Sequence, residues 1–123
     1  MNIAIIGIGS IGSYVAAMFA QHTGHHLYLL ARSNYLIIQE QGIVIEETLN
    51  NESVKTHRFA VVDDINKIPA CEFVILAVRE AQLANLLPDL RRICLDRTKI
   101  VCLQNGINFE KKIQEAFAKL FPL

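Results

Sequence analysis

The chain has 123 residues, of which 52% are hydrophobic and 20% charged, and its 12 basic side chains balance 12 acidic ones. This length and apolar share suit one domain with a single core, and a net charge of zero offers no electrostatic footprint for nucleic acid or an anionic membrane. Because no apolar run approaches the roughly 20 residues that cross a bilayer and no signal peptide is recognised, we expect a cytoplasmic protein without nucleic-acid or membrane partners.

The N-terminal segment predicts a strand, a glycine turn and a helix. The apolar run Ile3–Ile6 leads directly into the pattern G-x-G-x-x-G, formed by Gly7, Ile8, Gly9, Ser10, Ile11 and Gly12. In this pattern the first glycine allows a tight turn, the second lets the backbone approach a pyrophosphate, and the third lets the helix pack closely on the strand. The start of the following helix would direct free N–H groups toward the phosphates. The alternative is a glycine-rich turn in another kind of α/β protein.

The remaining apolar runs are short and do not alternate, which is typical of parallel strands buried on both faces. Together with the first run, the predicted strands are Ile3–Ile6, Leu27–Ala31, Phe73–Val78 and Ile100–Leu103. Helical spacing of apolar residues lies between and after them, and it predicts helices at Ile11–Gln21, Ser33–Gln41, Ala81–Ile93 and about Phe109 to Leu120.

Two further segments interrupt this alternation of strands and helices. Ile43–Glu47 and Val54–Val62 flank the turn signal Asn50-Asn51, and we interpret them as an inserted, antiparallel strand pair. Asp63-Asp64 then predicts the start of a helical turn around Ile65–Ile68. The chain is thus predicted to be one dinucleotide-binding α/β domain over residues 1–123, with a Rossmann-like, doubly wound and mainly parallel sheet.

The end of the second predicted strand indicates which dinucleotide is bound. Domains that prefer NAD place an acidic residue about 20 residues after the glycine motif, where it binds the adenosine ribose. Here Arg32 comes 20 residues after Gly12; its guanidinium can donate a bidentate pair to a 2′-phosphate, and Ser33 adds a hydroxyl donor. We therefore predict NADP(H), with an exposed arginine at a strand end as the alternative.

The cysteines and histidines do not predict a metal site. The three cysteines are Cys71, Cys94 and Cys102, and their spacing fits no zinc pattern. Cys102 lies within an apolar run and is expected to be a buried free thiol.

Several segments together resemble the N-terminal domain of the ketopantoate reductase (2-dehydropantoate 2-reductase) family. The matching residues are Ile3–Gly12, Ala31–Ser33, Val74–Arg79 and Ile100–Ile107. Their order and separations agree over nearly the whole chain, and Leu103-Gln104-Asn105-Gly106 is the most family-specific piece. The resemblance implies an NADPH-dependent oxidoreductase that reduces ketopantoate to pantoate, a step toward pantothenate and coenzyme A.

The resemblance also implies roles for individual residues. Arg32 matches the 2′-phosphate contact, and Asn105 matches an asparagine near the nicotinamide ribose and the substrate. Asn105 also follows a predicted parallel strand, at the edge where ligands bind in such sheets, although a turn-forming residue is the alternative. Val78 would line the same crevice. Arg79 stands where the family usually has a lysine that reaches cofactor and substrate, and arginine keeps the charge while changing the donor geometry; the alternative is a surface residue at a helix start.

A second departure concerns catalysis. The family continues into a C-terminal helical domain that supplies a general-acid lysine and a substrate-holding glutamate, and neither has a match here. We therefore expect no catalytic residue in this chain, which would be nearly inactive alone, and expect its apolar tail Phe117–Leu123 to meet a missing domain or another copy. Three origins stay open: an excised domain, a natural truncation and half of a split enzyme. The competing functions are a non-catalytic NADP(H)-binding module and another NADP-dependent dehydrogenase.

Overall fold

The computed structural model describes residues 1–22, 24–47, 52–103 and 115. The predicted last helix lies outside these residues except for Glu115. The described elements are β1 (Asn2–Ile6), α1 (Ser10–Ala20), β2 (His26–Leu30), α2 (Tyr35–Gln41), β3 (Ile43–Glu47), β4 (Glu52–Thr56), β5 (Ala60–Val62), the 3₁₀ turn η1 (Ile65–Lys67), β6 (Cys71–Leu76), α3 (Glu80–Ile93) and β7 (Cys94–Cys102).

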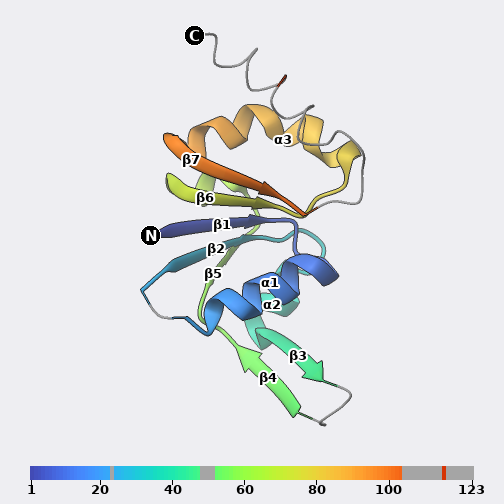
Figure 1. Ribbon diagram of the computed structural model, residues 1–123. Helices are drawn as coiled ribbons and strands as arrows, with labels where there is room; N and C mark the ends of the chain where they lie inside the picture. The colour runs from blue at the N-terminus through green and yellow to red at the C-terminus, as the bar shows by residue number, and fades with distance from the viewer. Residues whose placement is uncertain (23, 48–51, 104–114, 116–123) are drawn as a thin grey trace.

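Five parallel strands form the main sheet in the order β5-β2-β1-β6-β7. Chain order runs outward in both directions from β1, so the sheet has the doubly wound, Rossmann-like arrangement with its topological switch between β1 and β6. The predicted fold class is confirmed. The inserted pair is also present, since β3 and β4 form a separate antiparallel sheet that projects beyond α1 and α2 (Figure 1).

Apolar side chains fill both faces of the main sheet. In β1, Ala4 and Ile6 point into a core shared with Leu86 and Leu90 of α3. The alternate residues, such as Ile5, point into a second core built with α1 and α2. Because side chains alternate along a strand, burial on both faces requires the continuous apolar runs seen in the sequence.

The prediction that Val54–Val62 is one strand of the inserted pair is wrong in its second half. Only β4 pairs with β3, whereas β5 joins the main sheet beside β2. A tight turn separates the two strands: the Arg58 N–H donates to Thr56 Oγ1 at 3.3 Å, and the Phe59 N–H donates to the His57 carbonyl at 2.8 Å. The turn redirects the chain, so Phe59 and Val61 pack against the second core.

The last described strand is longer than predicted and begins directly after α3. An irregularity lies between the pairs Cys71–Cys94 and Phe73–Lys99. There, Thr98 Oγ1 accepts from the Leu95 N–H and donates to the Cys71 carbonyl, both at 2.6 Å. Because Asp96 and Arg97 are charged and exposed, the first half of this strand lacks the apolar run that predicts a buried strand. Cys71 is fully buried, whereas Cys102 is half-buried, so the thiol in the core is not the one expected.

The short turn before β6 is formed as predicted. Asp64 accepts from the Asn66 N–H at 2.9 Å and caps η1. None of the helices in the described part of the chain is long and apolar enough to span a membrane. Within the same residues, no group of three or more His, Cys, Asp or Glu side chains is arranged to hold a metal ion.

Candidate functional site

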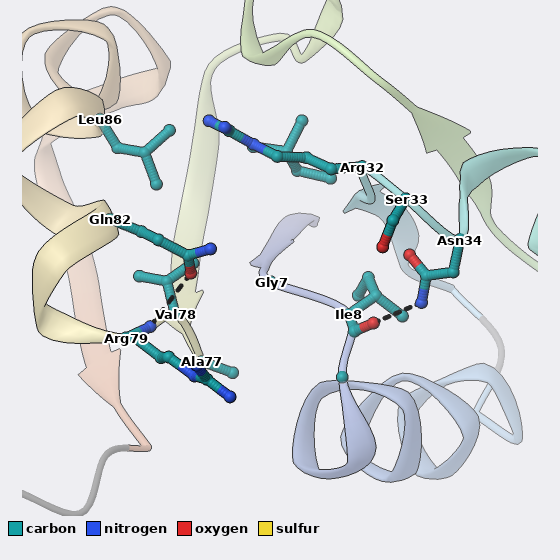
Figure 2. A pocket seen from close by; sticks show the side chains of 12 residues that line it. Gly7, Ile8, Arg32, Ser33, Asn34, Ala77, Val78, Arg79, Gln82 and Leu86 are labelled. Carbon is teal, nitrogen blue, oxygen red and sulfur yellow. Dashed lines mark hydrogen bonds between the residues drawn. The ribbon is translucent and has the colours of Figure 1, made fainter.

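A cavity of about 200 Å³ opens where the carboxyl ends of β1, β2 and β6 meet. This is the switch point of the sheet, the position at which open α/β sheets bind ligands. Figure 2 shows its walls, which come from three segments separated in sequence. The lining residues are Gly7, Ile8, Gly9, Leu30, Arg32, Ser33, Asn34, Ala77, Val78, Arg79, Gln82 and Leu86.

Two glycines hold the loop after β1 close to its neighbours. Gly7 has a φ of +96°, and a Cβ there would lie 2.8 Å from the Ala77 carbonyl oxygen. A Cβ on Gly12 would overlap the Gly7 carbonyl oxygen. Any side chain at either position would therefore push α1 or the end of β6 away from the loop.

Gly9 differs from these two glycines because the space around it is open. Apart from Gly9 itself and its two chain neighbours, no atom lies within 4 Å of the position that its Cβ would occupy. The Gly9 carbonyl accepts from the Ser13 N–H at 2.9 Å, which is the first hydrogen bond of α1. The loop therefore presents bare backbone beside a helix N-terminus, an arrangement that fits a phosphate group.

The end of β2 forms the second wall. Arg32 and Ser33 are both exposed, and the Arg32 guanidinium extends from β2 toward Leu86 of α3 (Figure 2). Arg32 and Leu86 also line an adjoining recess of about 400 Å³. Arg32 therefore stands between the two spaces.

The adjoining recess has a different charge. It contains Asp63, Asp64, Asp89, Lys67 and Asn85. Asp63 accepts from the Lys67 ammonium at 2.9 Å, and this hydrogen bond lowers the pKa of the Asp63 carboxyl. The described lining of the first cavity instead carries two arginines and no carboxylate, so an anion is favoured there.

The start of α3 forms the third wall. Val78 is buried and Arg79 is exposed. The Arg79 N–H donates to Gln82 Oε1 at 3.2 Å, which satisfies one of the free donors at the helix start. The Arg79 guanidinium thus lies at the cavity wall on the opposite side from Arg32 and Ser33 (Figure 2).

Most of the residues predicted for the site come together in the structure. Seven of them line the cavity, namely Gly7, Ile8, Gly9, Arg32, Ser33, Val78 and Arg79. Ser10, Ile11 and Gly12 form the first turn of α1 and are not among the described lining residues. Asn105 lies outside the described residues.

Sequence reasoning missed two polar side chains of the cavity, Asn34 and Gln82. Asn34 had a local signal, because asparagine is common before a helix. Gln82 also had a local signal, because it lies three residues after Arg79, which is the spacing of a capping box at the start of a helix. Neither signal shows that the side chain faces a ligand cavity.

Comparisons with known proteins identify the family of this chain. The family model described as ketopantoate reductase PanE/ApbA matches residues 3–122. A 2-dehydropantoate 2-reductase of Nostoc sp. is 30% identical over 113 residues, which are 91% of this chain and 34% of that protein. One from Mesorhizobium japonicum is 32% identical over 87% of this chain and 32% of that protein. This chain thus spans about a third of the length of these curated relatives.

Solved structures give the same result. The crystal structure of 2-dehydropantoate 2-reductase from Methylococcus capsulatus has a TM-score of 0.77 at 30% identity, covering 95% of this chain and 37% of that one. The ternary structure of D-mandelate dehydrogenase with NADH and anilino(oxo)acetate has a TM-score of 0.76 at 26% identity, with the same coverage. Sequence and fold agree over nearly the whole length, and this chain belongs to the ketopantoate reductase PanE/ApbA family.

Proposed function

We propose that this chain is the NADP(H)-binding part of a reductase that acts on 2-dehydropantoate or a similar small 2-keto acid. The observation that carries this proposal is the cavity at the switch point, where open glycine backbone and two arginines surround one space. Membership of the family supports the reaction type. The substrate class rests on the names of the relatives, which are 2-dehydropantoate 2-reductases.

Each wall of the cavity would bind a different part of the dinucleotide. The backbone at Gly9 and the start of α1 would hold the pyrophosphate. Arg32 would donate to a 2′-phosphate on the adenosine ribose, assisted by the Ser33 hydroxyl. An arginine at this position has no acceptor for the ribose hydroxyls, which is why we favour NADPH, although the related D-mandelate dehydrogenase was solved with NADH.

The same arrangement suits reduction of a keto acid. When bound, a reduced nicotinamide would supply a hydride to the keto carbon, and the keto oxygen would take up a proton from a donor that is not among the described lining residues. Val78 would line the crevice. Arg79, at the wall across from Arg32, would hold a phosphate or the substrate carboxylate, and Asn105 would lie near the nicotinamide ribose and the substrate.

Titration with NADPH and NADH, followed by fluorescence, tests the cofactor assignment. We expect wild type to prefer NADPH, and Arg32→Ala to weaken NADPH by about ten- to a hundredfold, because a charge-assisted hydrogen bond contributes about 1.5–3 kcal/mol. Arg32→Asp should reverse the preference. Arg58→Ala is the matched control, since Arg58 is exposed at the other end of the sheet. Equal affinity of wild type for both dinucleotides, or binding of neither, would refute the assignment.

Catalysis by this polypeptide is expected to be very weak. Among the described lining residues there is no lysine, histidine or carboxylate, and general acid catalysis typically accelerates such steps by about 10²–10⁴-fold. An NADPH-oxidation assay with ketopantoate should therefore show almost no turnover, even at NADPH concentrations at which the fluorescence titration shows binding. Rapid turnover would show that this chain already contains the proton donor.

A further inference from the structure

We propose that Asn34 is a positioning residue, whose side-chain amide holds the glycine loop in the conformation that receives the pyrophosphate. The inference rests on the proposed function, because it concerns the affinity of the same site for a dinucleotide. It assigns a role to a side chain that would not touch the reacting atoms.

The contact that motivates this proposal joins two walls of the cavity. Asn34 Nδ2 donates to the Ile8 carbonyl oxygen at 2.6 Å, across 26 residues of sequence and in a partly buried setting. Figure 2 shows the asparagine reaching from the turn after β2 to the loop after β1. The side chain of Asn34 is thus hydrogen-bonded directly to the backbone of the glycine loop, which is formed by Gly7, Ile8 and Gly9.

Both ends of this link are held in place. The Asn34 carbonyl accepts from the Ile38 N–H at 3.0 Å, at the start of α2. The side chain of Ile8 is 6% exposed and belongs to the core beneath α1. The side-chain amide of Asn34 therefore restrains the peptide group between Ile8 and Gly9.

The hydrogen bond from Asn34 also fixes the direction of the Gly9 N–H, because the peptide group between Ile8 and Gly9 is planar. The described chain has no cis peptide bond, and in a trans peptide the carbonyl and the next N–H point in opposite directions. A carbonyl of Ile8 directed at Asn34 therefore directs the Gly9 N–H away from it. Gly9 lines the cavity, and apart from Gly9 and its chain neighbours no atom lies within 4 Å of its Cβ position, so we infer that this donor faces the open space that suits a phosphate.

Loss of the amide would leave this peptide group free to rotate in the unliganded protein. Binding would then have to order it, and such ordering reduces affinity. A typical neutral hydrogen bond corresponds to a change of about three- to tenfold in the dissociation constant. Because the pyrophosphate is common to both dinucleotides, NADPH and NADH should be affected equally.

The test replaces Asn34 by leucine, which has nearly the same shape and cannot donate. Asn2→Leu is the matched control, because Asn2 Nδ2 donates to the Ala70 carbonyl at 3.1 Å at the opposite edge of the sheet. Fluorescence titration would measure NADPH and NADH, and competition would measure 2′-AMP, which contains the 2′-phosphate but no pyrophosphate.

We expect Asn34→Leu to weaken both dinucleotides by about three- to tenfold, with their ratio and the affinity for 2′-AMP unchanged. Asn2→Leu should leave all three affinities at the wild-type value. If Asn34→Leu does not fold, Asn34→Ala should show the same pattern. Wild-type affinity of a folded Asn34 variant for both dinucleotides would overturn the inference and leave the proposed function standing. A parallel loss of 2′-AMP would also overturn it, and a wild type that binds no dinucleotide would overturn both.

Discussion

The carboxyl and amino edges of the main sheet are made by the same strands, yet they present different groups. At the carboxyl edge, the glycine loop, the starts of α1 and α3 and two arginines meet around one cavity. At the amino edge, His25, His26 and Arg58 line a recess of about 270 Å³ with apolar neighbours. Each edge also has an asparagine amide that donates to a backbone carbonyl.

The difference follows from strand direction. In a parallel sheet every strand ends at the same edge, so each following helix begins there and directs its free N–H groups toward that edge. The helix ends, with their carbonyl groups, lie at the other edge. A similar hydrogen bond therefore has a different consequence at each edge: Asn2 links two segments, whereas Asn34 also orients a group beside the cavity.

The largest effect on this comparison should come from adding a methyl group at Gly12, in the first turn of α1. In Gly12→Ala the new Cβ would overlap the Gly7 carbonyl oxygen, and such overpacking typically costs about 1–3 kcal/mol of stability. Displacement of the loop should also reduce NADPH affinity by at least about tenfold, since several donors lose their positions. Urea unfolding and fluorescence titration would measure the two effects.

Gly24→Ala is the control for this variant at the amino edge. Gly24 has a φ of +90° and open space around it, so alanine adds backbone strain of about 1–2 kcal/mol without a clash. Stability should fall while NADPH affinity stays at the wild-type value. Equal loss of affinity in the two variants would show that the edges are not functionally distinct.

A smaller effect, confined to stability, is expected from Glu72 at the amino edge. Its Oε2 accepts from the Asn2 N–H at 2.7 Å, and this hydrogen bond lowers the pKa of the Glu72 carboxyl below its ordinary value. A carboxyl with a lowered pKa stabilises the fold above that ordinary value, about 4.5, and its contribution disappears as the pH falls through the lowered value.

Glu72→Gln should therefore make urea stability less dependent on pH in this acidic range, because the amide oxygen can still accept the hydrogen bond and does not titrate. At pH 7 the variant should bind NADPH as wild type does. An unchanged slope of stability against pH would show that this carboxyl is not coupled to folding. A change in NADPH affinity would break the functional separation of the two edges.

Local patterns in the sequence predicted much of the fold and most of one wall of the site. The continuous apolar runs were enough for β1, β2 and β6, because a strand buried on both faces has to be apolar throughout. The glycine spacing predicted the loop, because only glycine fits the close approach at Gly12 and the positive φ at Gly7. The strand end placed Arg32 and Ser33 at the cavity.

Elements that depend on a partner strand were predicted less well. β5 has only three residues, and nothing in them distinguishes the expected pairing with β3 from the observed pairing with β2. The start of β7 carries exposed charges, and its pairing depends on Thr98, whose hydroxyl bridges to the Cys71 carbonyl 27 residues away.

The buried strands β1, β2 and β6, the glycine turn and the chemistry of Arg32 were thus determined by the sequence itself, since each depends on residues close together in the chain. The tertiary structure decided which turns meet. It brought Asn34 to Ile8 and set Gln82 beside the same cavity, because hydrogen bonds between distant segments depend on how the strands are ordered in the sheet, and that order is not encoded in any single segment.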